Sequence, residues 1–158
     1  MVTIEWCCRH KDGIRLIEPN ENLTNGYMQK AEDALGTMNR ERNYNRMFAI
    51  SACYYSMYYS LYAILMRIGI KCEIHACTIE FMKFALSGFY SEEEIKTIKK
   101  AFEARNTSQY YVDRIVADND ANFIIAQAPF FFSKSKEILS KLNEKNIKEI
   151  REKIKNLV

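Results

Sequence analysis

The segment Tyr44–Gly69, with the sequence YNRMFAISACYYSMYYSLYAILMRIG, sets the architecture of this chain. Between Arg46 and Arg67 it contains no charged residue, and its apolar side chains are distributed nearly all round a helix. A helix without a polar face is buried from several sides. We therefore expect residues 44–68 to form the central helix of a bundle or to line a dimer interface, with Gly69 ending the helix.

Further helical patterns on both sides of this segment predict a bundle, because their apolar residues recur three or four positions apart. The clearest helix start is Ser91 with Glu94, which form a capping box and open a helix toward Tyr111. The other helices are expected at about residues 24–40, 75–86, 118 or 120 onward, and 146–158. The fold class is therefore all-α: an antiparallel up-and-down bundle of four to five helices, followed by a charged C-terminal helix with a solvated face.

The N-terminal residues have a sequence pattern that predicts β-strands. Val2–Arg9 and Ile14–Glu18 flank the pair Asp12-Gly13, which is typical of a tight turn. We predict a short N-terminal β-hairpin that ends at Pro19. The expected organisation is a hairpin appendage over residues 1–20, a helical bundle over 21–143 and the charged helix over 144–158.

Composition excludes several classes of protein. Apolar residues make up 48% of the 158 residues and aromatic residues 13%, too many for a disordered chain. The net charge is +3 and the basic residues gather after Lys134, so no general coating for nucleic acid is visible. The apolar stretch Met57–Met66 is too short to cross a membrane. Five cysteines and no secretory signal favour free thiols and a cytoplasmic location.

The sharpest local pattern is the run Arg105–Tyr111, RNTSQYY, at the end of the expected fourth helix. A guanidinium suits phosphate because its fork bonds two oxygens and stays charged. Asn106 and Tyr110, one turn apart, would lie beside it, as would Tyr111. The same run also fits a solvated helix end whose Arg interacts with the last carbonyl groups.

Two other sets of residues have both a structural and a functional interpretation. Tyr54, Tyr58 and Tyr62 form one helical stripe, which favours core packing over a stacking platform for bases. Cys72, His75 and Cys77 lack the paired spacing of known zinc sites, so we predict neither metal nor cofactor. His75 becomes a possible acid or base if the fold brings it to Arg105.

The order of these motifs resembles the HEPN superfamily, including its single-domain bacterial and archaeal members. The resemblance covers about residues 22–142. The motifs that carry it, in chain order, are Tyr27 with Lys30-Ala31, Ala52-Cys53-Tyr54-Tyr55 with Tyr58, Gly69-Ile70, His75, Arg105-Asn106 with Tyr110-Tyr111, and the helix through Phe123 and Phe132.

The resemblance implies a bundle of four or five helices that usually forms a homodimer. Many such proteins are metal-independent ribonucleases, with an Arg, often a polar residue after it, and a His a few residues later, and two copies meet at the dimer cleft. Others are noncatalytic, and many are paired with a minimal nucleotidyltransferase as toxin and antitoxin. In such pairs a tyrosine near the motif can receive the nucleotide. Arg105 matches the motif Arg, and Asn106 matches the polar residue that follows it.

The chain departs from this pattern at the motif histidine, which should fall at Tyr110, Tyr111 or Val112. Tyrosine, with a pKa of about 10, is a poor base at pH 7. The leading hypothesis is therefore a HEPN-like dimer that binds a nucleotidyltransferase partner or a nucleotide, with weak or no nuclease activity. The alternatives are an active metal-independent endoribonuclease toxin that acts on RNA, with His75 in the acid/base set, and a noncatalytic interaction domain.

Overall fold

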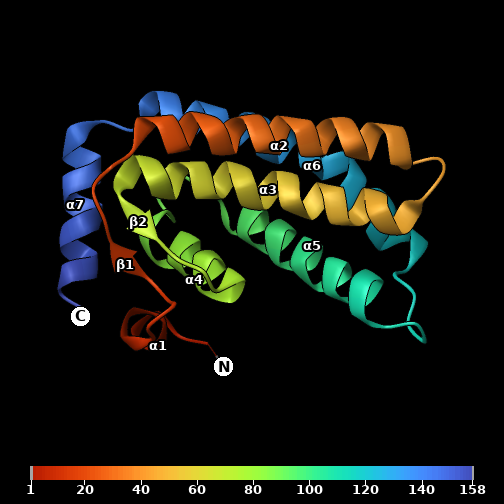
Figure 1. Cartoon of the computed structure of the whole chain (residues 1–158), viewed down its shortest axis with the longest axis horizontal. Helices are drawn as coiled ribbons and strands as arrows, with labels where there is room; N and C mark the ends of the chain where they lie inside the picture. Colours follow the sequence, from red (N-terminus) through yellow and green to blue (C-terminus); the bar gives the residue numbers. More distant parts are fainter. Residues whose placement is uncertain (1, 158) are drawn as a thin grey trace.

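Helices dominate the computed structural model, which describes residues 2–157 (Figure 1). The predicted all-α fold with a small antiparallel β element is confirmed. The elements are α1 (Ile4–Arg9), β1 (Arg15–Leu16), α2 (Glu21–Glu41), α3 (Arg46–Ile68), β2 (Ile70–Lys71), α4 (His75–Ala85), α5 (Glu92–Tyr110), α6 (Asp118–Lys141) and α7 (Glu144–Lys155).

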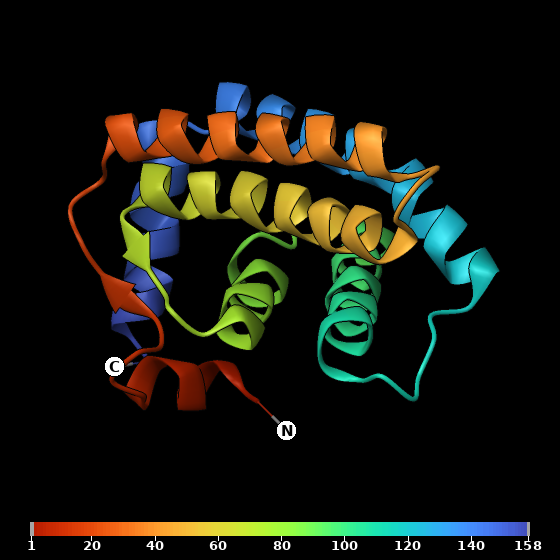
Figure 2. The same ribbon diagram turned by 45° about the vertical axis from the view of Figure 1, so that its right-hand side comes forward.

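The central helix of the bundle is α3, as its sequence predicted. It contacts α2, α5 and α6, and most of its side chains are buried. Asn45 begins it by accepting a hydrogen bond from the backbone N–H of Phe48, and Gly69 ends it with a φ of 85°. In Figures 1 and 2, α2 lies antiparallel along α3, while α4 and α5 cover the opposite side of α3. No helix within residues 2–157 has the length and apolar character needed to cross a membrane.

The predicted N-terminal hairpin is wrong in its pairing. Residues 4–9 form α1, whose buried side chains Ile4, Cys7 and Cys8 have helical spacing. Gly13 has no positive φ, and the backbone N–H of Ile14 donates back to the carbonyl of Cys7. The strand β1 therefore pairs with the distant β2, in the antiparallel register Arg15↔Lys71 and Leu16↔Ile70.

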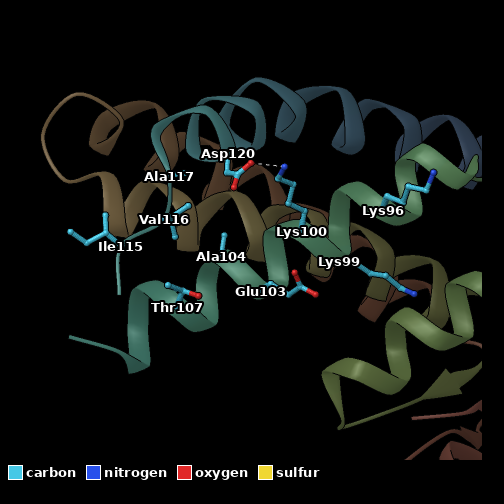
Figure 3. A pocket seen from close by; sticks show the side chains of 10 residues that line it. All are labelled: Lys96, Lys99, Lys100, Glu103, Ala104, Thr107, Ile115, Val116, Ala117 and Asp120. Carbon is cyan, nitrogen blue, oxygen red and sulfur yellow. Dashed lines mark ion pairs between the residues drawn. The ribbon is translucent and has the colours of Figure 1, made fainter. Parts of the chain in front are cut away.

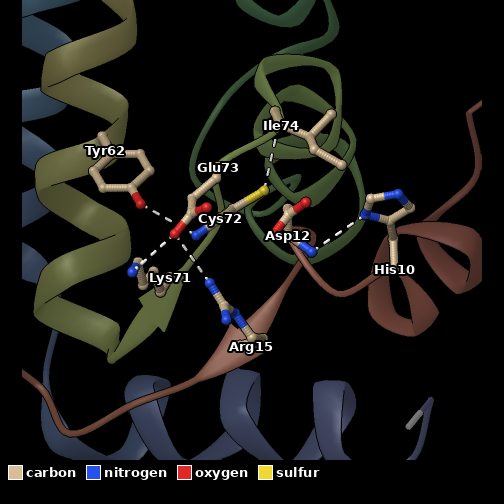
Figure 4. A network of polar contacts seen from close by, with 8 residues as sticks. All are labelled: His10, Asp12, Arg15, Tyr62, Lys71, Cys72, Glu73 and Ile74. Carbon is tan, nitrogen blue, oxygen red and sulfur yellow. Dashed lines mark hydrogen bonds and ion pairs between the residues drawn. The ribbon is translucent and has the colours of Figure 1, made fainter.

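Polar contacts support this β1–β2 ribbon (Figure 4). Arg15 and Lys71 each form an ion pair with Glu73, at 3.1 and 2.9 Å. The backbone N–H of Cys72 donates to the hydroxyl of Tyr62 on α3, at 3.1 Å. Exposed ion pairs contribute little stability individually, so the buried contact to Tyr62 matters more. Together these contacts fix the segment that leads from α3 into α4.

A disulfide between Cys7 and Cys77 corrects the expectation that all five cysteines are free thiols. The bond joins residues 70 positions apart and ties α1 to α4. Closing a loop of that length constrains the unfolded chain, which stabilises the fold by about 4 kcal/mol in the chain-entropy account. Cys8, Cys53 and Cys72 are free and buried. Within residues 2–157, no three His, Cys, Asp or Glu side chains are grouped to hold a metal ion.

Candidate anion-binding site

Three helices bring polar side chains together on one side of α3. Tyr54 comes from α3, His75 is the first residue of α4, and Arg105 lies near the end of α5. The position of His75 follows from the β1–β2 ribbon and from the Cys7–Cys77 bond, which fix the chain on both sides of it. The site is thus assembled by the packing of α4 and α5 against the central helix.

Arg105 is buried, with only 6% of its surface exposed. Its guanidinium carbon lies 5.0 Å from the ring centre of Tyr54 and 5.3 Å from that of Tyr55. Nη1 donates to Asn106 Oδ1 at 2.8 Å and to the Tyr110 hydroxyl at 3.4 Å. These contacts use only part of the hydrogen-bonding capacity of the guanidinium, which has five N–H donors.

The positive charge of Arg105 has no carboxylate partner in residues 2–157: it takes part in none of the ion pairs there. Its Nε is buried and makes no hydrogen bond within that range. Burial of an unpaired charge is costly, and an anion with oxygen acceptors would offset much of that cost. Within residues 2–157, the surroundings of Arg105 therefore leave a buried positive charge without a carboxylate and one N–H donor without an acceptor.

His75 is held neutral beside this charge. The hydroxyl of Tyr54 lies 2.6 Å from His75 Nδ1, and Arg105 Nη2 lies 3.5 Å from the same atom. Burial, together with the nearby Arg105 charge, lowers the pKa of His75 from its ordinary value of 6.5 to about 4. Burial raises the pKa of Tyr54, so its hydroxyl stays protonated and donates to Nδ1. The imidazole proton is accordingly on Nε2.

This arrangement is better suited to binding than to proton transfer. A general base works best when its pKa lies near the operating pH. His75, with a pKa of about 4 and its Nδ1 already accepting from Tyr54, is a weak base at neutral pH. Arginine cannot give up its proton in this range. Around Arg105 the chain therefore offers hydrogen-bond donors and one fixed positive charge.

Most of the residues that the sequence suggested lie together. Arg105, Asn106, Tyr110 and His75 form one cluster, whereas Tyr111 does not join it. Tyr111 follows the last residue of α5, and the centre of its ring lies 4.2 Å from the guanidinium carbon of Arg114.

The predicted core packing of the stripe Tyr54, Tyr58 and Tyr62 is confirmed, since all three side chains are buried. Sequence reasoning did not predict that the Tyr54 hydroxyl would also be the hydrogen-bond partner of His75. The ring of Tyr58, on the same stripe, stacks on His75 at 4.1 Å. The spacing of four residues that places both tyrosines on one side of α3 was the available signal.

A hollow of about 640 Å³ between α5 and the chain entering α6 provides a contrast (Figure 3). It is lined by three lysines, but each already has a carboxylate partner. The pairs are Lys96 with Glu93, Lys99 with Glu80, and Lys100 with Asp120. In Figure 3 the side chains of Lys100 and Asp120 point toward each other. The lysine charges around this hollow are therefore neutralised by carboxylates of the chain. The charge of Arg105 has no such partner within residues 2–157.

Fold and site together define a helical bundle with a buried arginine that has no carboxylate partner within residues 2–157. The chain belongs to the HEPN family, because the model of the HEPN domain matches residues 24–139. The match includes α3, α4 and α5, and so contains the Arg105 cluster. Comparison with curated proteins gave no match.

Proposed function

We propose that this HEPN domain binds the phosphate group of a nucleotide or of RNA at Arg105, with weak or no ribonuclease activity. The observation that carries the proposal is the buried guanidinium without a carboxylate partner in residues 2–157. A phosphate can accept parallel hydrogen bonds from a guanidinium, and the Nε of this one, although enclosed, has no acceptor within residues 2–157. Asn106 and Tyr110 then act as positioning residues for the guanidinium.

The state of His75 favours binding over ribonuclease activity. In-line cleavage of RNA requires one group to remove the 2′-OH proton and another to protonate the leaving oxygen. Tyr110 and Tyr111 occupy the region where the family's ribonucleases have histidine, and the pKa of His75 is about 4. Arg105 would hold the phosphate, but efficient proton transfer at neutral pH has no suitable side chain in this cluster.

We further propose that the chain works as a homodimer with a minimal nucleotidyltransferase partner, as a toxin–antitoxin pair. Membership of the family supports this, since HEPN domains commonly dimerise. The hydroxyl of Tyr110 also supports it, because this side chain is 69% exposed and lies 3.4 Å from Arg105 Nη1. A partner enzyme would thus find an accessible hydroxyl directly beside a bound phosphate.

The test of the phosphate site compares Arg105→Met and Arg105→Lys with the wild type in calorimetric titrations with inorganic phosphate and AMP. We expect Arg105→Met to weaken binding by about 10- to 100-fold, the equivalent of the roughly 1.5–3 kcal/mol of a charged hydrogen bond. Lysine should rescue binding only in part, because it lacks the fork. The control Arg9→Met removes an exposed arginine of α1 and should leave affinity unchanged.

Circular dichroism of each variant would show that the fold is retained. A parallel assay follows RNA cleavage in the presence of a chelator. Absence of phosphate and AMP binding in the wild type would overturn the proposal. Rapid metal-free cleavage that disappears in Arg105→Met would favour the ribonuclease alternative instead.

A further inference from the structure

We infer that a groove beside Arg105, between α2 and α3, binds the base and sugar of the nucleotide whose phosphate Arg105 holds. The inference rests on the proposed phosphate site and adds the class of ligand: a mononucleotide unit, recognised by its base as well as its phosphate. The groove has a volume of about 530 Å³. Small-molecule sites commonly fall between roughly 300 and 1,000 Å³. Its lining includes Lys30, Phe48, Ser51, Tyr55, Tyr59 and Gln109.

The groove adjoins the phosphate site through Tyr55. This side chain lines the groove, and its ring centre lies 5.3 Å from the guanidinium carbon of Arg105. Gln109, four residues after Arg105 on α5, lines the same groove. A ligand that contacts both features would therefore carry a phosphate and an uncharged planar group joined by a short linker, as the sugar joins phosphate and base in a nucleotide.

Aromatic rings supply the surface for that planar group. Tyr55 and Tyr59 are one turn apart on α3, with ring centres 5.6 Å apart and ring planes 28° from parallel. Both remain partly exposed, unlike the buried Tyr54 and Tyr58 on the neighbouring stripe. Stacking on such rings tolerates any base, because every base has a π-face.

Ser51 is an independent indication that the groove takes a polar ligand. It is only 5% exposed and lines the groove, yet its Oγ makes no hydrogen bond within residues 2–157. Buried hydroxyls are normally hydrogen-bonded, and an unpaired one is costly. A base or a ribose offers the donor or acceptor that this hydroxyl lacks, whereas an apolar ligand would not.

Charges in the groove orient the ligand. Asp33 and Glu41 also line it and would repel a phosphate placed there. The ammonium group of Lys30 lies over the Tyr59 ring, 5.4 Å from its centre. The phosphate is thus directed to Arg105, while the neutral base and sugar occupy the groove.

The experiment titrates the purified protein with AMP, UMP and inorganic phosphate. We expect both nucleotides to bind at least 10-fold more tightly than phosphate. Tyr59→Leu and Ser51→Ala should each weaken nucleotide binding at least 5-fold, and neither should change the affinity for phosphate. The control Phe130→Leu removes an exposed aromatic side chain of α6 that does not line the groove, and it should change neither affinity.

The possible failures are distinguishable. If phosphate binds in an Arg105-dependent way but AMP and UMP bind no more tightly, the groove inference is wrong and the phosphate site stands. The inference also fails if Tyr59→Leu weakens phosphate and nucleotide equally, because the ring would then act only through the fold. If none of the three ligands binds, both proposals are wrong.

Discussion

The charge of Arg105 helps to keep the neighbouring His75 neutral. Arg105 Nη2 and His75 Nδ1 are 3.5 Å apart, so two positive charges there would repel strongly. An arginine side chain does not lose its proton in proteins, and the imidazole is therefore the group that stays neutral. Tyr54 fixes the tautomer by donating to Nδ1. At neutral pH the cluster thus carries one positive charge, which an anion can neutralise.

This pairing predicts a pH dependence of stability. The pKa of His75 is about 4 in the folded chain against 6.5 ordinarily, so the unfolded chain binds more protons between these values. The free energy of unfolding should fall as the pH drops through 6.5 toward 4, and the contribution of His75 to the slope should fade as the pH rises above 6.5. Urea unfolding at pH 7, 5.5 and 4 should show a steeper loss in the wild type than in His75→Gln.

The matched control for this experiment is His10→Gln, which replaces the other histidine of the chain, outside the site. It should retain the steeper pH dependence of the wild type. Parallel curves for the wild type and His75→Gln would contradict the assignment of a neutral, buried His75.

Arg151 of α7 caps the C-terminal end of helix α3. Nη1 of Arg151 donates to the carbonyls of Ile17, Ile68 and Gly69, at 2.8, 3.0 and 2.9 Å. The last carbonyls of a helix lack partners within the helix, so a cation there supplies both hydrogen bonds and a favourable charge. The expectation of a solvated charged tail was therefore incomplete, because α7 also buries Ile150 and Ile154 against the bundle.

Replacing this cap should destabilise the fold. Arg151→Met retains much of the apolar stem but loses all three hydrogen bonds, and hydrogen bonds to charged groups contribute roughly 1.5–3 kcal/mol. We expect the free energy of unfolding, measured in urea at pH 7, to fall by about that amount. Lys148→Met, on the exposed side of the same helix, should change it by less than about 0.5 kcal/mol. Equal effects of the two substitutions would show that the cap contributes little.

Helix α3 begins and α5 ends at the same end of the bundle (Figure 1), and apolar side chains are exposed there. Tyr44 and Phe48 lie on either side of the first residue of α3, and Val112 and Ile115 follow the end of α5. Exposed apolar patches of this kind often mark protein interfaces. Contact between two copies through this end would bring their Arg105 sites toward each other.

The proposed dimer is tested by light scattering at micromolar concentration. We expect a dimer for the wild type, and a monomer with unchanged circular dichroism for Val112→Asp or Ile115→Asp, because a buried unpaired charge disfavours the interface. The control Phe130→Asp places the same charge at an exposed position of α6, and it should leave the dimer intact. A wild-type monomer, or a dimer that resists both aspartates, would exclude this interface.

Local patterns in the sequence were sufficient to predict α3, its glycine end and the capping box of Ser91 with Glu94, because helix periodicity and capping involve residues within a few positions of one another. The sequence also indicated Arg105 as a residue suited to phosphate, because the chemistry of a guanidinium does not depend on the fold. It could not show how deeply the side chain is buried, which depends on the rings of α3 packed around it.

Long-range packing alone established the remaining features. The pairing of β1 with β2, the Cys7–Cys77 bond over 70 residues and the contact of Tyr54 with His75 over 21 residues each join segments that have no local signal for one another. The pKa of His75 belongs with them, because it reflects burial and the charge of an arginine 30 residues away. Such quantities arise only when the chain is folded, since they are properties of distances in space rather than of neighbours in sequence.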